Sequence, residues 1–156
     1  MRRILYDLAT AYAAASGCGC EVEEGGSRAE LSVEGLSVHI GLVEESDMML
    51  FQTAVAVLPS EEAGRGECCR QLLAANNLFV GTLGFTLGVD EETQIVTLQI
   101  AWDALRLDAE GFGRIVNNLL SVALDWMLRL DDWRPSPPAR EGEDSDEPLP
   151  MHFLKV

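Results

Sequence analysis

The spacing of apolar residues changes several times along this chain, and each spacing predicts an element. Residues 2–16 place apolar side chains such as Leu5 and Leu8 at helical intervals, which predicts an amphipathic helix. Gly17 is well placed to end that helix, because glycine readily adopts the left-handed conformation found after helices. Residues 18–27 contain two adjacent glycines and are expected to form a loop.

Three strands are predicted in the next part of the chain. Residues 31–33 and 36–43 alternate apolar and polar positions, which is typical of half-buried strands, and a tight turn is expected at residues 34–35. A second turn is expected at residues 44–47. Residues 48–58 are more continuously apolar, so we expect them to form a central strand.

A helix and a two-stranded hairpin are expected to follow. Residues 67–78 have helical spacing, and Gly81 then allows an unusual backbone at the crossing. Residues 85–89 and 95–102 alternate in period two, and residues 90–93 between them, Asp-Glu-Glu-Thr, have turn chemistry. Two strands alone are marginally stable, so a helix must pack against them.

The last predicted helix has the broadest apolar stripe. Asp108 is a credible N-cap, with Glu110 in the first turn. The stripe should make this helix the main cover of the sheet, and Leu119→Ala should cost roughly 2–5 kcal/mol if Leu119 is buried. Its members are Phe112, Ile115, Val116, Leu119, Val122, Ala123, Trp126, Met127 and Leu130.

The predicted order is α-β-β-β-α-β-β-α. It indicates an α+β fold with a mainly antiparallel, twisted sheet packed by helices. We expect one domain over residues 1–131 and a Pro-rich, acidic tail over residues 132–156, extended or disordered because it cannot bury a core. The tail ends in the apolar residues 151–154, which either fray or dock on a groove of their own or a neighbouring subunit.

Charge excludes two classes of partner. The 156 residues carry 26 Asp and Glu against 11 Lys and Arg, a formal net charge of −15. Nucleic acids and anionic membranes both require a basic surface, so neither is expected to bind. The acidity suits a partner with a basic segment, or serves solubility alone. Asp7 interrupts the N-terminal apolar stretch, so we expect no signal peptide. No apolar run approaches the length of a membrane span, so we expect a cytoplasmic protein.

No set of residues indicates catalysis, a metal or a cofactor. Cys18, Cys20 and the adjacent pair Cys68-Cys69 lack the C-x-x-C spacing of zinc and redox sites, so reduced, partly buried thiols are expected. The two histidines, His39 and His152, are expected to be structural or solvated. The strands carry more apolar residues than one sheet face can obviously cover, which favours a dimer interface or a ligand groove over the alternative of a well-covered monomer.

One segment carries a family resemblance. Residues 71–98, QLLAANNLFVGTLGFTLGVDEETQIVTL, are followed by residues 107–112, LDAEGF, and a long apolar helix. Together they resemble the class I type III secretion chaperones, the Tir chaperone family that includes CesT-like and SycE-like members. The run Ala75-Asn76-Asn77-Leu78-Phe79 is one Asn longer than the family pattern.

The resemblance implies a non-enzymatic homodimer that holds an extended N-terminal segment of a secreted effector soluble and competent for secretion. The segment would enter apolar patches and extend the sheet by strand addition. Candidate effector-binding residues lie on the first helix and first strands: Leu5, Leu8, Leu31, Val33, Leu36 and Val38. Candidate dimer residues lie on the second helix and the following hairpin: Leu72, Leu78, Phe79, Phe85 and Leu87.

Two alternatives remain open from the sequence. One is a chaperone-like, peptide-binding or protein-binding domain that works outside secretion. The other is a small thiol or metal protein that uses the four cysteines.

Overall fold

The computed structural model describes residues 1–43 and 46–131. It contains three helices, six strands and two short 3-10 turns. In chain order they are α1 (Arg2–Ser16), β1 (Gly19–Val22), β2 (Arg28–Val33), β3 (Leu36–Leu42), β4 (Met48–Val57), α2 (Glu62–Asn76), η1 (Asn77–Phe79), β5 (Thr86–Val89), β6 (Ile95–Asp103), η2 (Ala104–Arg106) and α3 (Ala109–Asp131).

The six strands form one antiparallel sheet in the order β1-β2-β3-β4-β6-β5. The prediction of an α+β fold with a mainly antiparallel sheet is therefore confirmed. Strand β4 lies between β3 and β6, as its continuous apolar character predicts. Strands β1 and β5 are the two edges of the sheet.

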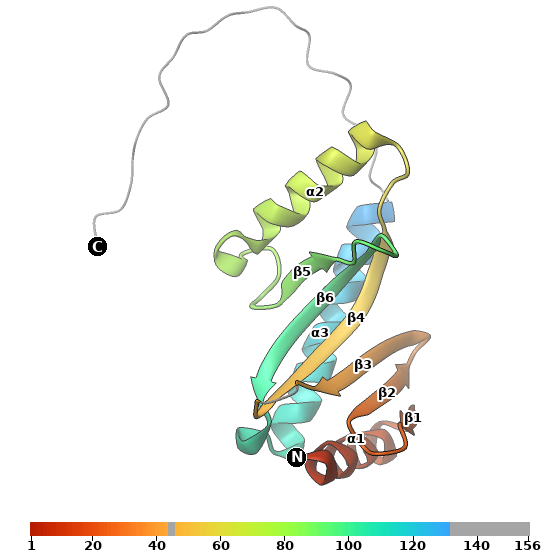
Figure 1. Cartoon of the computed structure of the whole chain (residues 1–156), viewed down its shortest axis with the longest axis vertical. Helices are drawn as coiled ribbons and strands as arrows, with labels where there is room; N and C mark the ends of the chain where they lie inside the picture. Colours follow the sequence, from red (N-terminus) through yellow and green to blue (C-terminus); the bar gives the residue numbers. More distant parts are fainter. Residues whose placement is uncertain (44–45, 132–156) are drawn as a thin grey trace, which may run out of the picture.

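Helices α1 and α3 cover one face of the sheet (Figure 1). Helix α3 packs on β4 and β6, and α1 packs on β1 and β2. Gly17 ends α1 with φ of 70°, and the backbone N–H of Gly111 donates to the Asp108 carboxylate at 2.7 Å, so both predicted helix boundaries are confirmed.

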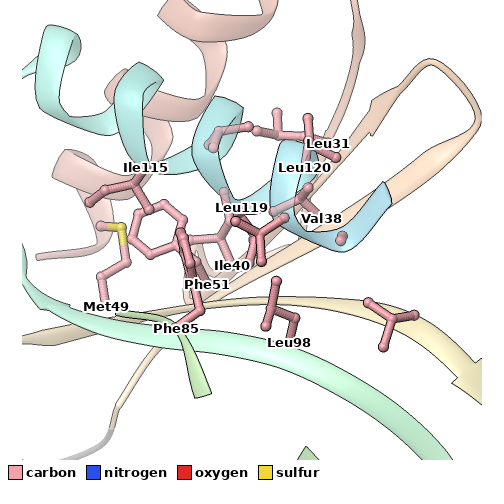
Figure 2. Close-up of a cluster of buried hydrophobic side chains, with 14 of the residues drawn as sticks. Leu31, Val38, Ile40, Met49, Phe51, Phe85, Leu98, Ile115, Leu119 and Leu120 are labelled. Carbon is pink, nitrogen blue, oxygen red and sulfur yellow. The ribbon is translucent and has the colours of Figure 1, made fainter. Parts of the chain in front are cut away.

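The core lies between α3, α1 and the covered sheet face, and Figure 2 shows its main side chains. The ring of Phe112 meets that of Phe51 edge-on at 5.3 Å between centroids, and that of Tyr12 at 5.9 Å. Tyr12 also donates a 2.7 Å hydrogen bond to the Asn117 side chain on α3. These contacts hold α1 against α3. The other face of β1–β4 is covered by no helix of the described chain.

Two elements differ from the prediction. Residues 19–22 form the edge strand β1, where a loop was expected, because Cys20 and Val22 alternate with Glu21 in a segment too short to stand out. Helix α2 begins at Glu62, ahead of the expected residue 67, because Gly64 lies in a buried position that compensates its poor helix propensity. It ends at Asn76, before the expected residue 78, and Leu78 has a positive φ that an α-helix does not accommodate. Residues 44–45 of the expected second turn, and residues 132–156 of the expected tail, lie outside the described part of the chain.

Candidate functional site

The end of α2 and the segment that follows it expose an unusual number of large apolar side chains. We call Leu73, Leu78, Phe79, Val80 and Leu83 the apolar turn. Leu78, Val80 and Leu83 are 82%, 79% and 78% exposed, and Phe79 is 51% exposed. Large exposed apolar side chains that lie close together in the sequence are typical of an interaction site.

The backbone of the apolar turn is strained. Leu78, Phe79 and Leu83 have φ of 54°, 55° and 52°, a region that residues with a Cβ rarely occupy. Each such residue costs on the order of 1–3 kcal/mol, and the surrounding structure must compensate it. Strain of this kind is typical of segments shaped for recognition.

Three contacts hold the strained turn in place. The Gly81 backbone comes so close to Ala75 that a Cβ there would lie 2.9 Å from the Ala75 Cβ, so only glycine fits. The indole N–H of Trp126 on α3 donates to the Gly81 carbonyl at 3.0 Å. The backbone N–H of Thr82 donates to the Phe79 carbonyl at 3.2 Å; the Thr82 side chain is buried, and its hydroxyl has no hydrogen-bond partner among the described residues. The apolar side chains are therefore presented on a fixed frame.

Asn76 occupies the free edge of β5. Its side-chain amide donates to the Leu87 carbonyl, and its side-chain oxygen accepts from the Leu87 N–H, both at 2.9 Å. In an antiparallel pair every second residue directs its N–H and C=O away from the neighbouring strand. The Asp90 N–H donates to the Ile95 carbonyl, so by this alternation Leu87 and Val89 are the residues of β5 that point away from β6. Asn76 thus leaves only Val89 with free edge groups on β5.

The opposite edge, β1, presents its backbone groups freely. The Glu23 N–H donates to the Arg28 carbonyl at 3.0 Å, and β1 pairs with β2 in the same register. By the same alternation, Glu21 bonds to β2, whereas Cys20 and Val22 direct their N–H and C=O groups away from the sheet. Unpaired groups of this kind are a template for another strand.

The uncovered face of β1–β4 is hollowed. A cavity of about 680 Å³ lies over these strands, with Leu50 in its lining and Glu21, Glu23 and Glu30 among its charged members. Ser37 donates to Glu30 at 2.7 Å, and His39 lies 3.7 Å from the same carboxylate. The face combines an apolar floor with a mainly acidic border.

The thiols do not form a site in the described structure. The four cysteines are free, and burial raises the pKa of the Cys68 and Cys20 thiols, which favours their protonated form. Within residues 1–43 and 46–131, no group of three or more His, Cys, Asp or Glu side chains is placed to hold a metal ion. No described helix is long and apolar enough to cross a membrane.

Helix α2 carries one strong surface ion pair. Arg70 donates two hydrogen bonds to the Glu67 carboxylate, at 2.6 and 2.8 Å, and Gln71 donates a third at 3.1 Å. The bonds from Arg70, and then that from Gln71, lower the pKa of Glu67 to about 2. The pair remains charged at every physiological pH.

The structure separates the six candidate effector-binding residues into two sets. Leu5, Leu31 and Val38 are 0% exposed and belong to the core, so they offer no surface to a partner. Leu8, Val33 and Leu36 are half-buried and pack at the margin of the core. The apolar periodicity of these elements identifies the core face, and it cannot distinguish the core from a binding patch.

The five candidate dimer residues divide in the same way. Leu72, Phe85 and Leu87 are each 4% exposed and stabilise the subunit itself. Leu78 and Phe79 belong to the apolar turn. Sequence reasoning missed its other members, Leu73, Val80 and Leu83. The available signal was the short apolar run of residues 78–80, which stands between Asn77 and Gly81.

Comparison with known proteins gives a family match. The model of the Tir chaperone protein (CesT) family matches residues 13–127. No curated protein sequence matches the chain closely enough to count as a relative.

Solved structures of similar fold include three complexes. The HopA1–SchA chaperone–effector complex matches with a TM-score of 0.62 at 15% identity, over 81% of this chain and 95% of that chain. The ExsC–ExsE complex matches with a TM-score of 0.57 at 23% identity, over 83% of this chain and 92% of that chain. The Yersinia pestis type III secretion chaperone SycH, in complex with a fragment of YscM2, matches with a TM-score of 0.56 at 15% identity, over 77% of this chain and 97% of that chain. At these identities the likeness concerns the fold.

Proposed function

The chain belongs to the Tir chaperone protein (CesT) family and is a type III secretion chaperone, and we propose that it holds its effector by adding an extended segment to the free edge of β1. The observation that carries this proposal is the difference between the two sheet edges. Asn76 already satisfies Leu87 on β5, whereas the outward groups of Cys20 and Val22 on β1 have no such cap.

Strand addition suits a client that must stay unfolded. Backbone hydrogen bonds supply affinity without requiring a particular sequence, and side-chain patches beside the edge supply selectivity. The half-buried side chains of Leu8, Val33 and Leu36 lie on the elements near this edge, so we retain them as candidate client contacts. The complexes of SchA with HopA1 and of SycH with YscM2 are consistent with such a role.

We further propose that the apolar turn joins two copies of the chain. A homodimer would cover five large apolar side chains that are otherwise in water, and that desolvation is favourable by about 25 cal/mol per Å² of apolar surface. The two β1 edges would then remain available to one client. We place this activity in the cytoplasm, before export, and assign no catalytic step to it.

A proline in β1 tests the strand addition. Val22→Pro removes one outward N–H and leaves the β1–β2 ladder intact, since proline is tolerated on the free side of an edge strand. We expect at least fivefold weaker binding of the client's N-terminal segment, because one backbone bond is lost and the strand cannot continue past it. The segment is taken from the protein that co-purifies from the native host and is titrated by calorimetry.

Val22→Ala is the matched control, because it removes the side chain and keeps the N–H. Strand addition predicts near-normal binding for the alanine variant and weak binding for the proline variant. Equal losses in both would show that the Val22 side chain, and not the strand edge, is what the client contacts.

A further inference from the structure

The uncovered face of β1–β4 carries an arrangement that is unfavourable in the free protein. Glu21 on β1 lies directly opposite Glu30 on β2 in the sheet register. Two like charges in this position are destabilising, and opposite charges there would stabilise the sheet. Selection for stability alone would not place two carboxylates here.

The neighbours of this pair only partly compensate it. His39 lies opposite Glu30 on the other side, with its Nδ1 3.7 Å from the carboxylate, and Ser37 donates to the same group. Among the described residues, Glu21 has no ion-pair or side-chain hydrogen-bond partner, and Arg28, the nearby cation, pairs with no carboxylate. A positive group from outside would therefore find an unneutralised acceptor.

An apolar floor lies beside the carboxylates. Leu50 on β4 is half-buried even though no helix covers it, and its cross-strand neighbours are Gly41 and Ala101. The small neighbours leave Leu50 at the bottom of the cavity of about 680 Å³, with Val43 also in the lining. Apolar side chains from a partner can be buried there while cations beside them reach the carboxylates.

We propose that this hollow binds a segment of the secreted client in which Lys or Arg side chains alternate with apolar ones. The proposal rests on the assigned chaperone function and adds the chemistry by which this chain selects its client. Charge complementarity is the reason for this choice of occupant, since Glu21, Glu23 and Glu30 outnumber Arg28 in the lining. The chain's own residues 141–147 hold five acidic and no basic side chains, so their charge does not complement this border.

Three short labelled peptides test the proposal on the full-length chain by fluorescence anisotropy. The first alternates Leu with Lys, the second Leu with Glu, and the third Ser with Lys. We expect binding of the Leu–Lys peptide only, because the second is repelled and the third has nothing to bury. Its affinity should fall as salt is added.

Glutamine variants locate the binding. Glu21→Gln combined with Glu30→Gln should lower the affinity for the Leu–Lys peptide roughly fivefold, since two partly exposed charge contacts are lost. Glu91→Gln with Glu92→Gln, in the β5–β6 turn, changes the net charge equally and should bind as the wild type does. Glu21→Gln alone should raise the melting temperature by about 1 to 4 °C, because it relieves the like-charge pair.

Several results would overturn the inference. Equal binding by the two double variants, equal binding of the Leu–Glu peptide, or a lower melting temperature of Glu21→Gln would each do so. A lower solution mass of Glu21→Gln with Glu30→Gln would show that a second copy of the chain occupies the hollow.

The failure of this inference is distinguishable from failure of strand addition. If Val22→Pro weakens client binding and the glutamine variants do not, the client adds to β1 and the hollow has no role. If only the glutamine variants weaken the client, the hollow binds it without strand addition.

Discussion

Leu78→Asp combined with Phe79→Asp should convert the proposed dimer to a 17.0 kDa monomer at micromolar concentration. The side chains of Leu78 and Phe79 are 82% and 51% exposed, and a partner copy would bury both positions. The introduced Asp carboxylates would then be buried without a counter-ion. Each buried, unpaired carboxylate costs several kcal/mol, so the dissociation constant should rise by a factor of more than 100. Light scattering coupled to size-exclusion chromatography measures the mass.

The fold of the variant should be preserved. Both residues have positive φ, and Asp occupies that region more readily than Leu or Phe, so the backbone of the turn is not strained further. Leu128→Asp is the control, since Leu128 is 67% exposed on α3 and lies outside the apolar turn. A wild-type mass for the double variant would remove the apolar turn from the dimer interface.

Leu119→Ala should lower the free energy of unfolding by about 2–5 kcal/mol. Leu119 is 0% exposed and lies in the cluster of Figure 2, where α3 meets the sheet. The loss combines the transfer of the removed atoms with the cavity that remains in a layer held by rigid strands. Urea denaturation of both proteins, at one protein concentration because a dimer's stability depends on it, measures the difference.

Leu128→Ala provides the comparison on the same helix. Its side chain is largely in water, so the same substitution should change the free energy of unfolding by less than about 0.5 kcal/mol. Similar effects at positions 119 and 128 would mean that α3 does not pack as described.

The fold was predictable where the apolar pattern is long and regular. The stripe of α3 and the alternation in β6 each fix one buried face, so their place in the structure follows from solvent exclusion. Strand β1 was not predictable, because its four residues contain Gly19 and Cys20 and are held by pairing with β2. Local propensity says little about an element that tertiary contacts stabilise.

The candidate site was harder to predict from the sequence for a related reason. Leu72 and Leu78 are both leucines in one predicted helix, yet the first is 4% exposed and the second 82%. The change comes from the positive φ at Leu78, which the sequence does not encode through any glycine at that position. Similarly, Asn76 caps β5 from eleven residues away, a contact that only the folded chain reveals.

Amide hydrogen exchange of the complex with the client's N-terminal segment, followed residue by residue by NMR, tests the central claim most directly. The account predicts that the amides of Cys20 and Val22 exchange more slowly once the segment is bound, because they then donate to its carbonyls. The Leu87 amide, already bonded to Asn76, should exchange at the same rate in both states. Unchanged exchange in β1 together with new protection along β5 would contradict it.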